Sequence, residues 1–189
     1  AEQSRRYGTK MDILSQSAAE IIKAVQDGHS KVADIAKAVL ERLERTEPSL
    51  HAWAYVDPVA VKARAAALDT QSRRGPLHGL PIGVKDLMDT MDMPTEYGSS
   101  IYRGWTPAQD AEMVARLRDA GALLIGKTTT TEFACFHPTP TTNPHNAAHT
   151  PGGSSSGSAA AVSANVVPLA LGSQTAASIT RPASYCGVV

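Results

Sequence analysis

The chain has 189 residues, of which 42% are hydrophobic and 19% charged, a composition typical of a folded globular domain. Its 18 basic residues balance its 18 acidic ones, and a formal net charge of zero argues against nucleic-acid binding through bulk positive charge. The only two cysteines, Cys135 and Cys186, make a disulfide scaffold unnecessary. No apolar run approaches the ~20 residues of a membrane span. We therefore expect a soluble, cytoplasmic enzyme or module.

The first 70 residues are predicted to be mainly helical. Ser17 and Glu20 have the spacing of a capping box, which predicts that a helix begins there and ends at Gly28. The following elements are expected to be a helix over residues 30–44 closed by Pro48, a short strand over 52–56 and an Ala-rich helix over 59–70. We assign residues 1–70 to an N-terminal helical segment and residues 71–189 to a core.

In the core, short apolar runs alternate with helical stretches. Strands are predicted over residues 80–84, 121–125 (ended by Gly126) and 166–171, and helices over 111–120, 131–136 and 156–165. Strand, helix and strand at this spacing predict βαβ units with parallel pairing.

A Gly/Ser run over residues 151–158 is the most unusual stretch of the chain. Taken alone, it also fits a flexible linker. However, it joins directly to the apolar residues 159–162, so we expect it to open a packed helix. A tight loop at a helix N-terminus exposes N–H donors that can hold an anion or a developing oxyanion.

Two further stretches follow predicted strands. Residues 172–178 come after strand 166–171, at the edge where open parallel sheets bind ligands, although an ordinary polar turn is the simpler interpretation. Lys85 comes at the end of strand 80–84. Most lysines are solvated surface charges, but burial here would lower the pKa of Lys85 and make it a usable base.

Together these stretches resemble the amidase signature family. The resemblance is carried, in chain order, by residues 76–86, 126–128, 132–134, 143–144, 152–162, 168–172, 178–179, 182–183 and 186–188. It covers the chain from about Pro76 to Val189, and the helices before it look like the N-terminal region of that family.

The resemblance implies a Ser–cis-Ser–Lys triad, a variant of nucleophile-plus-base catalysis. Carried over by motif, Ser178 is the nucleophile, Ser154 the bridging serine after a cis peptide bond, and Lys85 the base. Ser155 is the alternative candidate for the bridging role, but it lies one residue closer to Ser178 than the family spacing requires. The resemblance also implies an oxyanion hole formed by backbone N–H groups of Thr175, Ala176, Ala177 and Ser178.

For substrate binding, the resemblance points to Ala134 and Cys135. We expect Cys135 to be buried beside Phe133 and Phe136, with the alternative that it borders the acyl pocket. His145 and His149 have metal-like spacing, but their Pro- and Asn-rich loop does not favour a metal site. No metal and no cofactor is implied.

Four positions depart from the common family pattern. Gln174 stands where many members have Asp, and Ala176-Ala177 replaces Gly-Gly. An alanine forced to positive φ would cost ~1–2 kcal/mol more than glycine. Arg181 lies one position later than the Arg of the pattern. We expect these changes to affect substrate orientation and the catalytic rate more than the triad itself.

The resemblance implies an α/β fold with a mixed, largely parallel sheet covered by helices on both faces. The family domain is longer, so we expect this chain to be a fragment holding its first part. The implied function is hydrolysis of a small-molecule carboxylic amide through a Ser acyl-enzyme, without nucleic-acid or membrane partners and with a possible homodimer. The alternatives are the glutamine-hydrolysing subunit of a tRNA-dependent amidotransferase and a degenerate, non-catalytic binding module.

Overall fold

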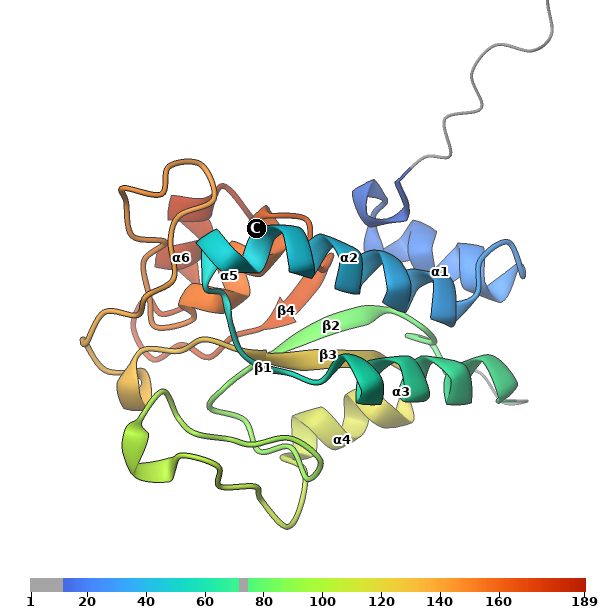
Figure 1. Ribbon diagram of the computed structural model, residues 1–189, viewed down its shortest axis with the longest axis horizontal. Helices are drawn as coiled ribbons and strands as arrows, with labels where there is room; N and C mark the ends of the chain where they lie inside the picture. Colours follow the sequence, from blue (N-terminus) through green and yellow to red (C-terminus); the bar gives the residue numbers. More distant parts are fainter. Residues whose placement is uncertain (1–11, 72–74) are drawn as a thin grey trace, which may run out of the picture.

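The computed structural model describes residues 12–71 and 75–189. Its centre is a four-stranded sheet of order β1-β3-β2-β4, shown in Figure 1. The strands are β1 (Trp53–Val56), β2 (Pro81–Lys85), β3 (Leu123–Thr128) and β4 (Leu169–Leu171). β2 pairs in parallel with both β3 and β4, whereas β1 is antiparallel to β3. The predicted mixed, largely parallel α/β fold is thus confirmed.

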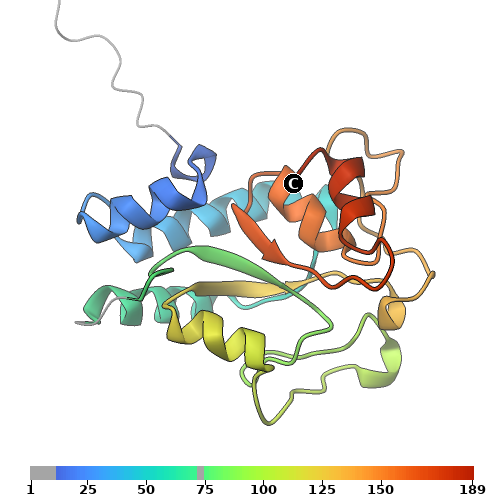
Figure 2. The same cartoon turned by 180° about the vertical axis from the view of Figure 1, so that it is seen from behind.

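Helices lie on both sides of this sheet. Figures 1 and 2 show α1 (Ala18–Gln26), α2 (Val32–Leu50) and α5 (Ser156–Ser163) on one side and α4 (Glu112–Asp119) on the other. The remaining helical elements are α3 (Pro58–Thr70), α6 (Thr180–Cys186) and the 3₁₀ turns η1 (Ile13–Ser15), η2 (Ser100–Tyr102) and η3 (Glu132–Ala134). Within the described ranges, no helix is both long and apolar enough to cross a bilayer.

The predicted capping box is present at the start of α1. The Glu20 carboxylate accepts a 2.8 Å hydrogen bond from the backbone N–H of Ser17, whose hydroxyl accepts from the N–H of Glu20. Gly28, with φ of +75°, follows the helix as expected.

The prediction that Pro48 closes the second helix is wrong, because α2 continues through Pro48 to Leu50. A proline so close to the end removes only one donor of the last turn. The Glu47 carboxylate accepts from the backbone N–H groups of Ala52 and Trp53 at 3.1 and 3.0 Å, and this leads the chain into β1.

The prediction that Gly126 ends its strand is also wrong, since β3 runs on to Thr128. A Cβ at position 126 would lie 2.3 Å from the carbonyl oxygen of Tyr55. Glycine therefore permits the close approach of β1 to β3 rather than breaking the strand. Other differences are smaller: β4 begins only after Pro168, and the expected helix over 131–136 is reduced to η3.

The core lies between the helices and the sheet. It includes apolar side chains of α1, α2, α3, β2 and β3, among them Ile21, Ile35, Val61, Ile82 and Ile125. Burial of these side chains stabilises the strand ends from which the polar residues described below project.

Candidate active site

Strand register brings the polar ends of β2 and β4 together. Val84 pairs with Leu171, so Lys85, the last residue of β2, lies beside the segment that leaves β4. Ser173 is in that segment and contacts Lys85 directly, with 2.8 Å between the Lys85 Nζ and the Ser173 Oγ. Sequence reasoning assigned no role to Ser173, although its place just after a strand parallel to β2 was a usable signal.

Lys85 is fully buried, and its second hydroxyl neighbour is Ser154. The Lys85 Nζ lies 2.7 Å from the Ser154 Oγ. Among the described residues Lys85 has no carboxylate partner in an ion pair. Burial disfavours the charged ammonium, and it lowers the pKa of Lys85 from 10.5 to about 8.

The Gly/Ser run is a packed segment that leads into α5, not a flexible linker. A Cβ at Gly157 would lie 2.1 Å from the carbonyl oxygen of Ala52, so this turn presses against the start of β1. The peptide bond between Gly153 and Ser154 is cis. The neighbouring Ser155 hydroxyl donates instead to the carbonyl of Ser173 at 3.3 Å. Of the two rival serines, only Ser154 contacts Lys85.

Ser178 lies in the same pocket as Ser154. The Ser178 carbonyl accepts a 3.0 Å hydrogen bond from the backbone N–H of Ser155, which ties the loop after β4 to the Gly/Ser run. The pocket has a volume of about 690 Å³. Its lining residues are Leu87, Thr131, Ala134, Cys135, Phe136, Pro138, Thr139, Thr150, Gly152, Gly153, Ser154, Ser156, Ser173, Gln174, Thr175, Ala176, Ala177, Ser178, Arg181 and Tyr185.

The loop over residues 175–178 lines this pocket. Within the described part of the chain, the backbone N–H groups of these four residues donate to no other group. Neither Ala176 nor Ala177 has positive φ, so the alanines cause no left-handed strain. The Gln174 Oε1 accepts from the backbone N–H groups of Ile179 and Thr180, both at 2.8 Å, and holds the turn that leads into α6.

Ala134 and Cys135 both line the pocket. The expectation that Cys135 is buried beside Phe133 and Phe136 is wrong, because Cys135 is exposed and Phe136 is 92% exposed. Phe133 and Ala134, which precede Cys135, have the left-handed φ values of 47° and 57°.

A buried ion pair lies next to Lys85 in the sequence. Asp86 and Lys127 are 3.1 Å apart and almost fully buried. Lys127 also donates to the carbonyl of Pro94 at 3.1 Å and to the hydroxyl of Thr95. Burial raises the pKa of Asp86, while the charge of Lys127 opposes that rise. Both residues were noted in the sequence only as parts of motifs.

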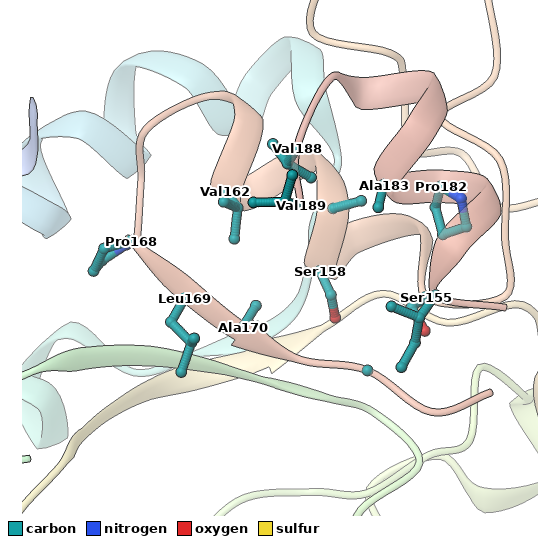
Figure 3. A pocket seen from close by; sticks show the side chains of 13 residues that line it. Ser155, Ser158, Val162, Pro168, Leu169, Ala170, Pro182, Ala183, Val188 and Val189 are labelled. Carbon is teal, nitrogen blue, oxygen red and sulfur yellow. The ribbon is translucent and has the colours of Figure 1, made fainter. Parts of the chain in front are cut away.

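A second, smaller cavity of about 100 Å³ lies between β4, α5 and α6 (Figure 3). Figure 3 shows Ala170 of β4 pointing toward Val162 of α5, with Val188 and Val189 nearby, whereas Leu169 points away from Val162. Neither Ser154 nor Ser178 lines this cavity, and none of its lining side chains is charged. The chemistry therefore belongs to the larger pocket.

Residues 34–189 match the model of a protein family described as Amidase. The chain belongs to the amidase family. Its relatives include a glutamyl-tRNA(Gln) amidotransferase subunit of Acidothermus cellulolyticus, which is 39% identical over 94% of this chain. The corresponding chloroplastic/mitochondrial amidotransferase subunit of Zea mays is 43% identical over 93% of this chain.

Solved amidase structures have the same fold. The native peptide amidase of Stenotrophomonas maltophilia superposes with a TM-score of 0.81 and 37% identity, covering 89% of this chain and 38% of that one. The chain likewise spans 37% of the length of the Acidothermus relative and 34% of the maize relative. The names of both relatives mention a tRNA. These names disagree with the expectation that the protein has no nucleic-acid partner.

Proposed function

We propose that this protein hydrolyses a carboxylic amide through an acyl-enzyme, with Ser178 as nucleophile, Ser154 as bridging serine and Lys85 as base. The observation that carries the proposal is the contact between the buried Lys85 amine and the Ser154 hydroxyl, in a pocket also lined by Ser178. A lysine can act as a base only in its neutral form. Burial favours that form because it disfavours the charged ammonium.

The proposed reaction moves one proton along the triad. Neutral Lys85 accepts the proton of Ser154, which accepts that of Ser178 as the Ser178 oxygen bonds to the amide carbonyl carbon. The tetrahedral oxyanion is stabilised by the free N–H groups over residues 175–178. The proton returns through Ser154 to the leaving nitrogen as the C–N bond breaks. Water, activated by the same relay, then cleaves the acyl ester of Ser178. Ala134 and Cys135 form part of the wall around the acyl group.

We propose that this reaction takes place in the cytoplasm, as the bacterial relatives suggest. We also propose that residues 71–189 form the first part of the catalytic core. A homodimer and a small-molecule amide as the binding partner are parts of the same proposal. The chain spans 37% and 34% of the length of the two relatives named above, so this activity is proposed for the protein as a whole.

A second candidate is the glutamine-hydrolysing subunit of a tRNA-dependent amidotransferase, and the names of the curated relatives favour it. The triad chemistry is the same, but the amide is glutamine and the ammonia passes to a partner. Affinity purification from the native host, followed by a glutaminase assay with and without the co-purifying proteins, separates the two. The third alternative, a degenerate binding module, rested on the Ala176-Ala177 pair, and neither of these residues has the positive φ that would strain an alanine.

The test is labelling of the intact protein with a fluorophosphonate probe and mapping of the adduct by mass spectrometry. We expect the adduct on Ser178, and none in Ser178→Ala. The matched control is Ser184→Ala, an exposed serine of α6 outside the pocket, which should label normally. An adduct on Ser154, or near-normal amide turnover in Ser178→Ala, would refute the assignment.

A further inference from the structure

The helix that follows the proposed nucleophile, α6, is only seven residues long. The backbone N–H of Arg181 donates to the carbonyl of Ala177 at 2.9 Å, so the helix is continuous with the turn that holds Ser178. A helix of this length is not stable in water by itself. Its placement, and with it that of Ser178, therefore depends on contacts with other segments. Figures 1 and 2 show α6 packed beside α5.

The last turn of α6 is held by three side-chain donors from elsewhere in the chain. The Nδ2 of Asn143 donates to the carbonyl of Tyr185 at 2.9 Å. The Nε2 of His145 lies 2.9 Å from the carbonyl oxygen of Cys186, and the hydroxyl of Ser163 donates to the same oxygen at 2.7 Å. Because a carbonyl only accepts, the His145 Nε2 carries the hydrogen. These donors, which we call the α6 anchor, satisfy carbonyls that a helix end leaves without intrahelical partners.

The anchor joins the two helices that begin at the proposed catalytic serines. α5 begins two residues after Ser154 and ends at Ser163, whereas α6 begins two residues after Ser178. At their starts the two segments are tied by the backbone N–H of Ser155, which donates to the Ser178 carbonyl at 3.0 Å. At their ends they are tied by the hydrogen bond from Ser163 to Cys186. The α6 anchor therefore helps to fix one serine relative to the other.

We propose that Asn143, His145 and Ser163 are positioning residues, which hold α6 against α5 so that the Ser178 hydroxyl can pass its proton to Ser154. The inference rests on the proposed amide hydrolysis. None of the three residues lines the larger pocket; they line a separate cavity of about 410 Å³, so they act through α6 and not on the substrate. Precise placement matters because a shift of about 1 Å at a reacting group can cost about 100-fold in rate.

The test uses the fact that His145 and Ser163 share one acceptor. Either donor alone still satisfies the carbonyl of the fully buried Cys186, so His145→Ala and Ser163→Ala should each slow fluorophosphonate labelling of Ser178 only about twofold. The double variant leaves this carbonyl without a donor in the described part of the chain. It should slow labelling about tenfold or more, which exceeds the product of the single effects.

A rescue variant and a control separate positioning from a general loss of structure. His145→Gln in the Ser163→Ala background should restore most of the labelling rate, because the glutamine amide can donate in place of the imidazole. His149→Ala removes an exposed histidine of the same loop that lines neither cavity, and it should label normally. Rates are compared in the intact protein at a temperature at which thermal denaturation shows each variant to be fully folded.

Amide hydrogen exchange tests the anchor independently of the reaction. In the double variant, exchange should quicken about tenfold over residues 179–187 and stay unchanged in β2 and β3. If Ser178 is labelled in the wild type and equally fast in the double variant, the inference is overturned and the proposed function stands. If the wild type is not labelled, the proposed nucleophile fails and exchange decides: faster exchange confined to residues 179–187 supports the anchor, and unchanged or global exchange overturns it.

Discussion

The Nζ of Lys85 lies 2.7 Å from the Oγ of Ser154, and both side chains are buried. The other side-chain neighbour of this nitrogen is the Ser173 hydroxyl, 2.8 Å away. In the described structure the amine is thus held by hydroxyl groups rather than by a carboxylate, which would have favoured its charged form.

The rate of amide hydrolysis should rise with pH and level off above about pH 8. The pKa of Lys85 is lowered to about 8, and only the neutral amine can accept a proton, so the active fraction grows as pH passes through that value. The measurement is kcat/KM of the intact protein between pH 6 and 10. A profile that is flat from pH 6 to 9 would contradict a lysine base.

Ser173→Ala should lower kcat about tenfold and leave KM nearly unchanged, because Ser173 orients Lys85 and does not act on the substrate. The Ser173 hydroxyl accepts from the charged ammonium, so its loss should lower the pKa of Lys85 further and move the rising limb of the pH profile to lower pH. Ser173→Thr keeps the hydroxyl and should restore both. A rate loss without any movement of the pH profile would indicate a merely structural role.

Lys127→Met should reduce the free energy of unfolding by about 3–5 kcal/mol, because it leaves the buried Asp86 carboxylate without its partner. Urea denaturation at pH 7 measures the change. The double variant Asp86→Asn with Lys127→Met should regain part of the loss. Lys37→Met is the matched control: it breaks an exposed pair with Glu41 and should change stability by less than about 1 kcal/mol. Equal effects of the two single lysine variants would rule out the buried-pair argument.

Gly157→Ala should destabilise the protein by about 1–3 kcal/mol or more, since the added Cβ meets the carbonyl of Ala52 at 2.1 Å. Because Gly157 lies in the first turn of α5, just after Ser154, activity should fall with stability. The control is Gly104→Ala, whose added Cβ would point into open space. Its backbone φ of +75° should reduce the free energy of unfolding by only ~1–2 kcal/mol. Thermal denaturation of both variants tests the difference, and an unchanged melting temperature in Gly157→Ala would show that the loop can move aside.

The sequence alone was sufficient for features whose signal is local. Ser17 and Glu20 predicted their helix start because both partners of a capping box lie within one turn. The order of motifs from Pro76 onward indicated the family, and the resemblance implied roles for Lys85, Ser154 and Ser178. The strand ends were less predictable. Gly126 was expected to end a strand, and only the close approach of Tyr55 from β1 explains why the strand continues there.

The tertiary structure alone decided the contacts that depend on strand register and burial. Ser173 reaches Lys85 because β4 pairs with β2, although the two residues are 88 positions apart in the chain. The pairing of Asp86 with Lys127 likewise arises between neighbouring strands. The hydrogen bond that joins the ends of α5 and α6 could be recognised only from the folded chain. Local sequence predicts hydrogen bonds closed within one turn, whereas these relationships exist only after folding has brought distant segments together and excluded water from between them.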